Sequence, residues 1–137
     1  MKKNNGFSLV ELIVVVAIMA VLVGILAPAY LSYVEKTRRG TDENMAEEVR
    51  HTVEISTAEI CVYDELKGGA TLAYADGCII ANIGSTHTKF AESMTDIYAE
   101  KTFTCKSKKY NGKTYTVTVA AATGGTGAAL TVTGAWN

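Results

Sequence analysis

Residues 12–34 form a stretch of 23 residues without a formal charge, bounded by Glu11 and Glu35. A helix rises about 1.5 Å per residue, so this stretch is long enough to cross the roughly 30 Å hydrocarbon layer of a bilayer. In a chain of 137 residues it leaves about 100 residues, which suffice for one small domain. We therefore expect a membrane-spanning helix followed by a single globular domain.

Glu11 is unusual at the head of such a stretch, because a charge in hydrocarbon is costly unless it has a partner. A secretory signal peptide would explain Lys2, Lys3 and the cleavage-like sequence 27–29, but its apolar core is shorter and requires no acid. An ordinary single-pass anchor would also fit the length. The basic residues that follow the stretch then slightly favour a cytoplasmic carboxyl side.

The residues that lead into the stretch support a third interpretation. The basic leader "MKKNN" is followed by "GFSLVE", residues 6–11, which closely resembles the class III signal of type IV prepilins. The resemblance implies that prepilin peptidase cleaves between Gly6 and Phe7 on the cytoplasmic face and methylates the new amine of Phe7. It also implies export of the carboxyl side, against the weak charge asymmetry.

The same resemblance implies a partner for Glu11. In a filament of packed helices, the family pairs this carboxylate with the amino terminus of a neighbouring subunit, here the amine of Phe7. A buried pair of this kind sets register more than it adds stability. Pro28 also matches the family and, with Gly24, is expected to kink or loosen the helix, although membrane helices commonly tolerate both residue types. Ala20 stands where the family usually has a glycine.

After Tyr33 the pattern becomes that of an amphipathic helix. This helix is expected to continue without a break to Lys67, where Gly68 and Gly69 stop it. The expected apolar side comprises Met45, Val49, Val53, Ser56, Ile60 and Tyr63, and the expected solvated side comprises Asp42, Glu43, Glu47, Glu48, Arg50 and Glu54. Three roles stay open for the charged cluster at residues 35–43. It could be a solvated collar, it could contact anionic lipid head groups, or its side chains could form ion pairs with those of neighbouring subunits.

Residues 68–101 give the weakest signals. A turn at 75–77 suggests a short hairpin, and a short helix is expected from Lys89 to Ala99. The expected apolar side of that helix comprises Phe90, Met94, Ile97 and Tyr98.

The carboxyl third is expected to form an antiparallel meander, because apolar residues alternate there with threonine and lysine. The inward positions would be Phe103, Cys105, Tyr115, Val117, Val119, Leu130, Val132 and Trp136. A three-residue loop, 110–112, with Gly112 in the left-handed region would pair residue 105 with 117 and residue 103 with 119. The glycine-rich segment 120–129 does not match a phosphate loop and is expected to be a flexible connection.

Three cysteines, Cys61, Cys78 and Cys105, allow one disulfide and one free thiol in an oxidising space. A Cys61–Cys78 bond would close a loop of 16 intervening residues and contribute about 3 kcal/mol. A Cys78–Cys105 bond is nearly as plausible. The carboxyl-terminal disulfide loop that family pilins often have is not expected, because no cysteine follows Cys105.

No catalytic, metal or cofactor site is expected. His51 and His87 are expected at the surface, with no nucleophile placed beside them by the sequence. Asp76 and Asp96 could bind calcium together with loop carbonyls, but they lack the spacing of an EF-hand. The net charge of −1 gives no electrostatic indication of nucleic-acid binding.

The prediction is an α+β fold in which one long amino-terminal helix, half transmembrane and half amphipathic, packs on a small antiparallel sheet. The expected segments are a leader (1–6), a hydrophobic helix (7–34), an amphipathic helix (35–67), a connecting region (68–101) and a β-meander (102–137).

The resemblance implies a structural subunit of a type IV pilus that serves adhesion, motility or DNA uptake. Such a subunit is stored in the membrane with its carboxyl-terminal domain outside, and is then processed and assembled by the pilus machinery into a helical homopolymer. The alternatives are a pseudopilin of a type II secretion system or competence pilus, and a monomeric membrane-anchored binding domain.

Overall fold

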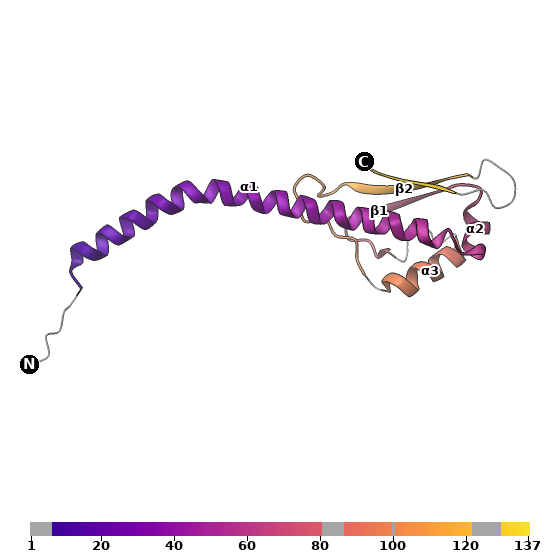
Figure 1. The fold of residues 1–137 in the computed structure, drawn as a ribbon, viewed down its shortest axis with the longest axis horizontal. Helices are drawn as coiled ribbons and strands as arrows, with labels where there is room; N and C mark the ends of the chain where they lie inside the picture. The colour runs from indigo at the N-terminus through magenta and orange to yellow at the C-terminus, as the bar shows by residue number, and fades with distance from the viewer. Residues whose placement is uncertain (1–6, 81–86, 100, 122–129) are drawn as a thin grey trace, which may run out of the picture. The chain divides into compact units, whose positions relative to one another are not determined.

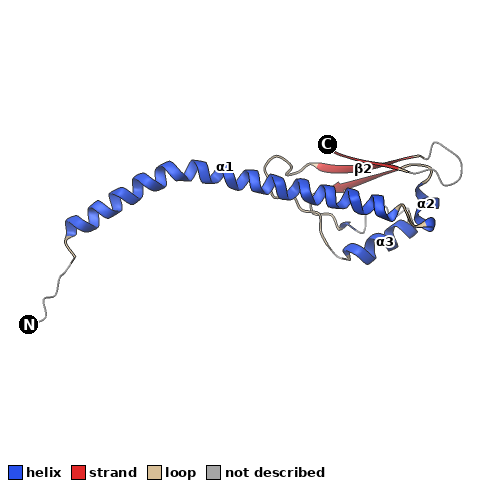
Figure 2. Ribbon diagram, in the orientation of Figure 1, coloured by secondary structure: helices blue, strands red, loops and turns tan. Residues whose placement is uncertain are grey.

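The computed structural model describes residues 7–80, 87–99, 101–121 and 130–137. In chain order its elements are α1 (Leu9–Ser56), α2 (Ile60–Leu66), β1 (Ala70–Ala75), α3 (Thr88–Tyr98), β2 (Thr114–Ala120) and β3 (Thr131–Trp136) (Figure 1). The long amino-terminal helix and the antiparallel sheet confirm the α+β class and are consistent with the pilin fold (Figure 2). The chain divides into two compact units, Met1–Lys36 and Thr37–Asn137.

The first unit contains the apolar part of α1. Its large apolar side chains from Leu9 to Tyr33 are all exposed. The most apolar 18-residue window of α1 has a mean hydropathy of 3.1, and within the described residues α1 is the helix whose length and composition would allow it to cross a membrane. A continuous apolar surface of this size requires lipid or other helices to cover it.

The second unit contains the rest of α1, which buries one side. Val49 and Val53 are fully buried, Ser56 is nearly so, and Met45 packs at the edge of the core. This confirms the predicted apolar side up to Ser56. The spacing of three or four residues places these side chains on one side of the helix, and that side faces the core of the second unit.

The predicted unbroken helix to Lys67 is wrong, because α1 ends at Ser56. Ala58 N–H donates to Ile55 O at 2.9 Å and Glu59 N–H donates to Ser56 O at 3.1 Å, and such bonds over three residues tighten the last turn. The hydroxyl of Thr57 also donates to a backbone carbonyl, as Ser and Thr side chains do where helices end.

The break changes which residues of the following helix are buried. The predicted positions were Ile60 and Tyr63, but Ile60 is 82% exposed and Tyr63 is half-buried. Val62 and Leu66 of α2 are buried in their place. The helical phase therefore starts again at Ile60, which a continuous period of 3.6 residues could not anticipate.

β2 is the central strand of an antiparallel sheet with the order β1-β2-β3. Leu72 of β1 lies opposite Val117, and Tyr115 lies between Tyr74 of β1 and Trp136 of β3. Figure 1 shows α1 and α3 on one side of this sheet. The side chains of β1 and β2 that enter the core are Leu72, Tyr74, Tyr115, Val117 and Val119, so the predicted alternation in β2 is confirmed.

The predicted pairing of residues 103 and 105 with β2 is wrong. Both edges of β2 are occupied, by β1 and by β3, which leaves no edge for a third partner. Phe103 and Cys105 are nevertheless buried. The turn that follows has Gly112 at φ +73°, as predicted, but it is closed by a bond from Lys113 N–H to Tyr110 O at 2.9 Å.

The turn at 75–77 forms, with Gly77 at φ +82° and Cys78 N–H donating to Ala75 O. It does not return the chain along β1; instead Ile79 bridges Thr102.

The helix predicted at 89–99 is confirmed as α3, with Phe90, Met94 and Tyr98 buried. Ile97 was predicted on the same side but is exposed. Of the glycine-rich connection, residues 122–129 lie outside the described residues.

Candidate processing and assembly site

Glu11 lies in the first turn of α1 and has a partner in its own chain. Its Oε2 accepts a hydrogen bond from the backbone N–H of Ser8 at 2.9 Å, one residue before the helix begins. The amino end of a helix has unpaired N–H groups and a partial positive charge, so a carboxylate in the first turn is stabilised there. This partner was not expected from the sequence, although the Ser-x-x-Glu spacing of a capping box indicates it.

Phe7 lies directly before this cap and is 88% exposed. Consecutive Cα atoms are about 3.8 Å apart, so an amine created at Phe7 would lie within one residue of the N–H group that Glu11 binds. Gly6 lies outside the described residues. Removal of a leader before Phe7 would therefore create an ammonium group close to the carboxylate of Glu11.

Residues 1–27 match the family described as the prokaryotic N-terminal methylation motif. The chain carries the amino-terminal signal of type IV pilins. The match covers Gly6, Phe7 and Glu11 together with most of the exposed apolar part of α1. The motif indicates a prepilin of the pilin or pseudopilin kind, and the helix in which it lies is long and apolar enough to cross a membrane. No solved structure matches the chain.

Gly24 and Pro28 lie in the apolar part of α1, and the helix continues through both. Pro28 has no N–H group, so the carbonyl of Gly24, four residues earlier, lacks its usual helical donor. A Cβ built at Gly24 would meet no atom within 4 Å in the described structure. Opening or kinking of the helix at this point stays a prediction.

The three cysteines of the chain are free and differ in environment. Cys61 is exposed on α2 and lies near Lys89. Cys105 is buried, and Cys78 is half-buried and close enough to interact with it. Burial, followed by the nearby Asp42, Asp76 and Cys78, raises the pKa of the Cys105 thiol to about 11.

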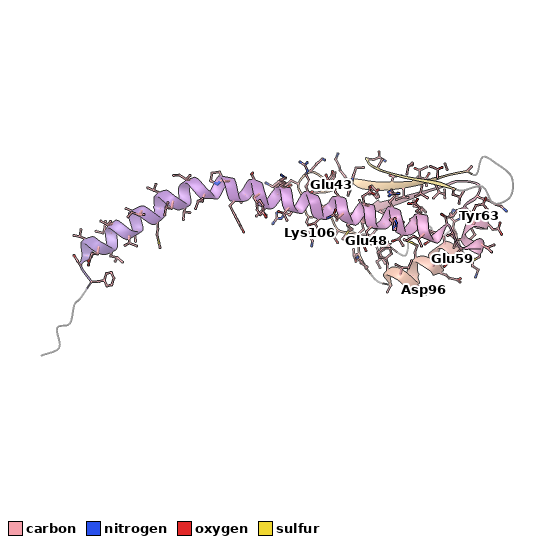
Figure 3. The ribbon with its side chains drawn as sticks, viewed as in Figure 1. Glu43, Glu48, Glu59, Tyr63, Asp96 and Lys106 are labelled. Atoms are coloured by element: carbon pink, nitrogen blue, oxygen red, sulfur yellow. The ribbon has the colours of Figure 1, made fainter. Side chains whose placement is uncertain are left out.

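The residues considered for catalysis or calcium do not come together. His51 is exposed, and His87 is half-buried just before α3. Asp76 Oδ1 accepts the N–H of Cys105 at 2.9 Å, whereas Asp96 is exposed on α3 (Figure 3). Among the described residues, no three His, Cys, Asp or Glu side chains form a group that could hold a metal ion.

Asp42 was predicted on the solvated side of the helix, and this is wrong, because it is 2% exposed. Its two carboxylate oxygens accept the backbone N–H groups of Lys106 at 2.9 Å and Ser107 at 2.8 Å. A buried carboxylate is tolerated when backbone donors satisfy it. Asp42 lies four and seven residues before the buried Ala46 and Val49, on the side of α1 that faces the core. Its own neighbours in sequence could not indicate that a distant segment would supply these donors.

Glu43, the next residue, is exposed and binds side chains of the same distant segment. Its Oε1 accepts the hydroxyl of Tyr110 at 2.6 Å, and it forms ion pairs with Lys109 at 3.7 Å and Arg39 at 3.8 Å. The Tyr110 hydrogen bond, together with the charges of Lys109 and Arg39, lowers the pKa of Glu43. Asp42 and Glu43 thus attach residues 106–110 to one turn of α1.

Proposed function

We propose that this chain is the structural subunit of a type IV pilus. It would be stored in the membrane as a prepilin through α1, cleaved between Gly6 and Phe7, methylated at Phe7 and assembled into a helical surface filament. The observation that supports this most strongly is the match of the methylation motif to residues 1–27, in a helix whose apolar side chains are all exposed from Leu9 to Tyr33.

Burial of this apolar surface supplies the driving force for packing the helices together. Repetition of one head-to-tail contact that does not close on itself produces a filament. In the packed helices Glu11 would leave the aqueous side of the membrane, and its charge would then require a cation. The proposed cation is the methylated ammonium of Phe7 from a neighbouring subunit.

The hydrogen bond from Ser8 suggests how the carboxylate of Glu11 is stabilised in a single subunit before assembly. Its carboxylate has a backbone donor and the positive end of the helix dipole as local partners. Assembly would therefore exchange or extend an existing set of interactions rather than bury an unsatisfied charge. This reasoning favours a subunit that is stable in the membrane before assembly and competent to join a filament.

The test combines electron microscopy of material sheared from the cell surface with mass spectrometry of its subunits. We expect filaments made of this chain, with an amino terminus at Phe7 that carries one methyl group. A chain that is processed at Phe7 but never occurs in surface filaments would instead support a pseudopilin of a secretion system or a competence pilus. A chain that retains residues 1–6 in the cell would contradict processing, and with it the proposal.

A further inference from the structure

Six basic side chains lie on two segments that contact each other at the start of the second unit, which we call the globular unit. They come from two segments far apart in sequence, the start of the second unit's part of α1 and the turn before β2. We name this group the basic collar: Arg38, Arg39, Lys106, Lys108, Lys109 and Lys113.

The collar depends on the contacts of Asp42 and Glu43. Asp42 binds the backbone of Lys106 and Ser107, and Glu43 binds the hydroxyl of Tyr110. Asp42 follows Arg38 by four residues, about 6 Å along the helix. Figure 3 shows Glu43 and Lys106 on either side of the same part of α1. Glu43 also pairs with both Lys109 and Arg39, so the segment that carries the lysines is held against the part of α1 that carries the arginines.

The charges of these two segments do not cancel. Residues 37–43 and 105–113 contain the six basic side chains but only two acids, Asp42 and Glu43. Asp42 is buried and occupied by backbone N–H groups. In the described part of the chain, Arg38, Lys106 and Lys113 form no ion pair. The whole chain carries a net charge of −1, so this positive surface is a local concentration of charge.

Only a few residues of chain separate the collar from the apolar stretch. Arg38 follows Val34, the last uncharged residue of that stretch, by four residues, which span at most about 14 Å in any conformation. The head-group layer is about 5–8 Å thick on each side of a bilayer, and charges act over about 8–10 Å at physiological salt. Tyr30 and Tyr33, both exposed, suit the boundary of the hydrocarbon, where tyrosine is enriched.

We propose that the basic collar binds the anionic phosphate head groups of the membrane in which the prepilin is stored. This rests on the proposed membrane-stored form but not on filament formation. Phosphate is also the chemical group of nucleic acid, and the position directly after the membrane segment favours lipid. The contact holds the globular unit at the membrane surface, and assembly releases it.

The experiment uses the full chain in lipid nanodiscs, whose two faces are both open to a soluble reagent. One set contains phosphatidylcholine alone, and the other contains about one-third phosphatidylglycerol as the anionic lipid. Acetylation of each lysine by an amine-reactive ester is followed by mass spectrometry. Lys67 and Lys89, which form ion pairs on α2 and α3, are internal controls in the same molecules.

We expect acetylation of Lys106 and Lys113 to slow by about threefold or more in the anionic nanodiscs, since each basic residue at such a surface changes its local equilibrium by about fivefold. Lys67 and Lys89 should keep their rates, and high salt should remove the difference. The double variant R38Q with K106Q should weaken the remaining protection of Lys113. The matched variant K67Q with K89Q, of equal charge change, should not.

Equal rates at Lys106 and Lys113 in both lipids would overturn the inference, as would equal slowing at all four lysines. Protection by added duplex DNA in phosphatidylcholine nanodiscs, without an effect of the anionic lipid, would assign the collar to nucleic acid instead. A chain that fails to enter nanodiscs would contradict membrane storage itself. Absent filaments or an unmethylated Phe7 would affect only the proposed function, because the nanodisc experiment requires neither.

Discussion

The backbone N–H of Ser8 donates to Oε2 of Glu11 at 2.9 Å, three residues along the chain. The acid that is costly in a membrane stretch therefore already has a partner at the head of its own helix. Two roles follow for Glu11, a local one as a helix cap and an inter-subunit one as the charge that pairs with an amino terminus. The two roles require different properties of the side chain, so they can be separated.

We predict that Glu11→Gln and Glu11→Ala both prevent filament assembly. Glutamine keeps an oxygen that can accept the Ser8 N–H, but it lacks the charge that a buried ammonium needs. Because an unpaired buried charge costs about 3–5 kcal/mol, the yield of sheared filaments should fall by far more than tenfold in both variants. Glu35→Gln, at the other end of the apolar stretch, is the control. Normal filaments from Glu11→Gln, with loss only in Glu11→Ala, would show that the cap alone matters.

Asp42→Ala is expected to destabilise the globular unit by about 2–4 kcal/mol, because it leaves the buried N–H group of Ser107 and the part-buried N–H group of Lys106 without an acceptor. Thermal unfolding of the full chain in detergent, followed by circular dichroism, measures this. Asp64→Ala removes an exposed acid that pairs with Lys67 and should have a much smaller effect. Equal effects of the two substitutions would contradict the role assigned to Asp42.

Glu65 should make stability depend on pH at the start of α3. Its carboxylate accepts the backbone N–H of Lys89, then that of Phe90, and the hydroxyl of Thr88. These bonds, led by the one from Lys89, lower the pKa of Glu65 below its usual 4.5. A lowered pKa means that the stabilisation is complete above 4.5 and is lost as the pH falls through the folded-state value.

Glu65→Ala should therefore lower the melting temperature at pH 7, and the difference from the unmodified chain should shrink toward pH 3. Melting curves of both proteins over this range give the result. Glu92→Ala, which removes the exposed partner of Lys89, serves as control. A difference that stays constant from pH 7 to pH 3 would count against the carboxylate as its origin.

Gly134 should not tolerate a side chain, because a Cβ placed there overlaps the hydroxyl and ring of Tyr115. Gly134→Ala is expected to reduce the free energy of unfolding by about 1–3 kcal/mol. Gly68→Ala, at a site with no atom within 4 Å, should be close to neutral. In a double-mutant cycle with Tyr115→Val, the alanine should cost less than it does alone, and an additive result would argue against the clash.

On oxidation we expect Cys78 to join Cys105 and Cys61 to stay free. The first two lie on facing segments, since Phe103 N–H donates to Cys78 O at 2.8 Å, whereas Cys61 is exposed beside Lys89. The raised pKa of Cys105 keeps that thiol protonated at neutral pH, so the bond should form faster at higher pH. Peptide mapping without reductant identifies the pair, and a Cys61–Cys78 bond would refute this assignment.

The sequence by itself determined the features that depend on local order along the chain. The charge-free stretch at 12–34, the Gly6 to Glu11 signal and the alternation in β2 are periodicities or fixed spacings, and they hold whatever the rest of the chain does. The burial of Val49 and Val53 was predicted correctly for the same reason, because both residues lie within one uninterrupted helix.

Only the tertiary structure decided which distant segments meet. The strand at 70–75 competes with residues 103–105 for an edge of β2, and no local pattern ranks two such partners. Because α1 ends at Ser56, Ile60, which was predicted to be buried, is exposed, and Val62 is buried instead. Asp42 is buried because the backbone at 106–107 supplies two donors from 64 and 65 residues away, and whether a carboxylate is solvated or buried depends on such donors rather than on its own neighbours in sequence.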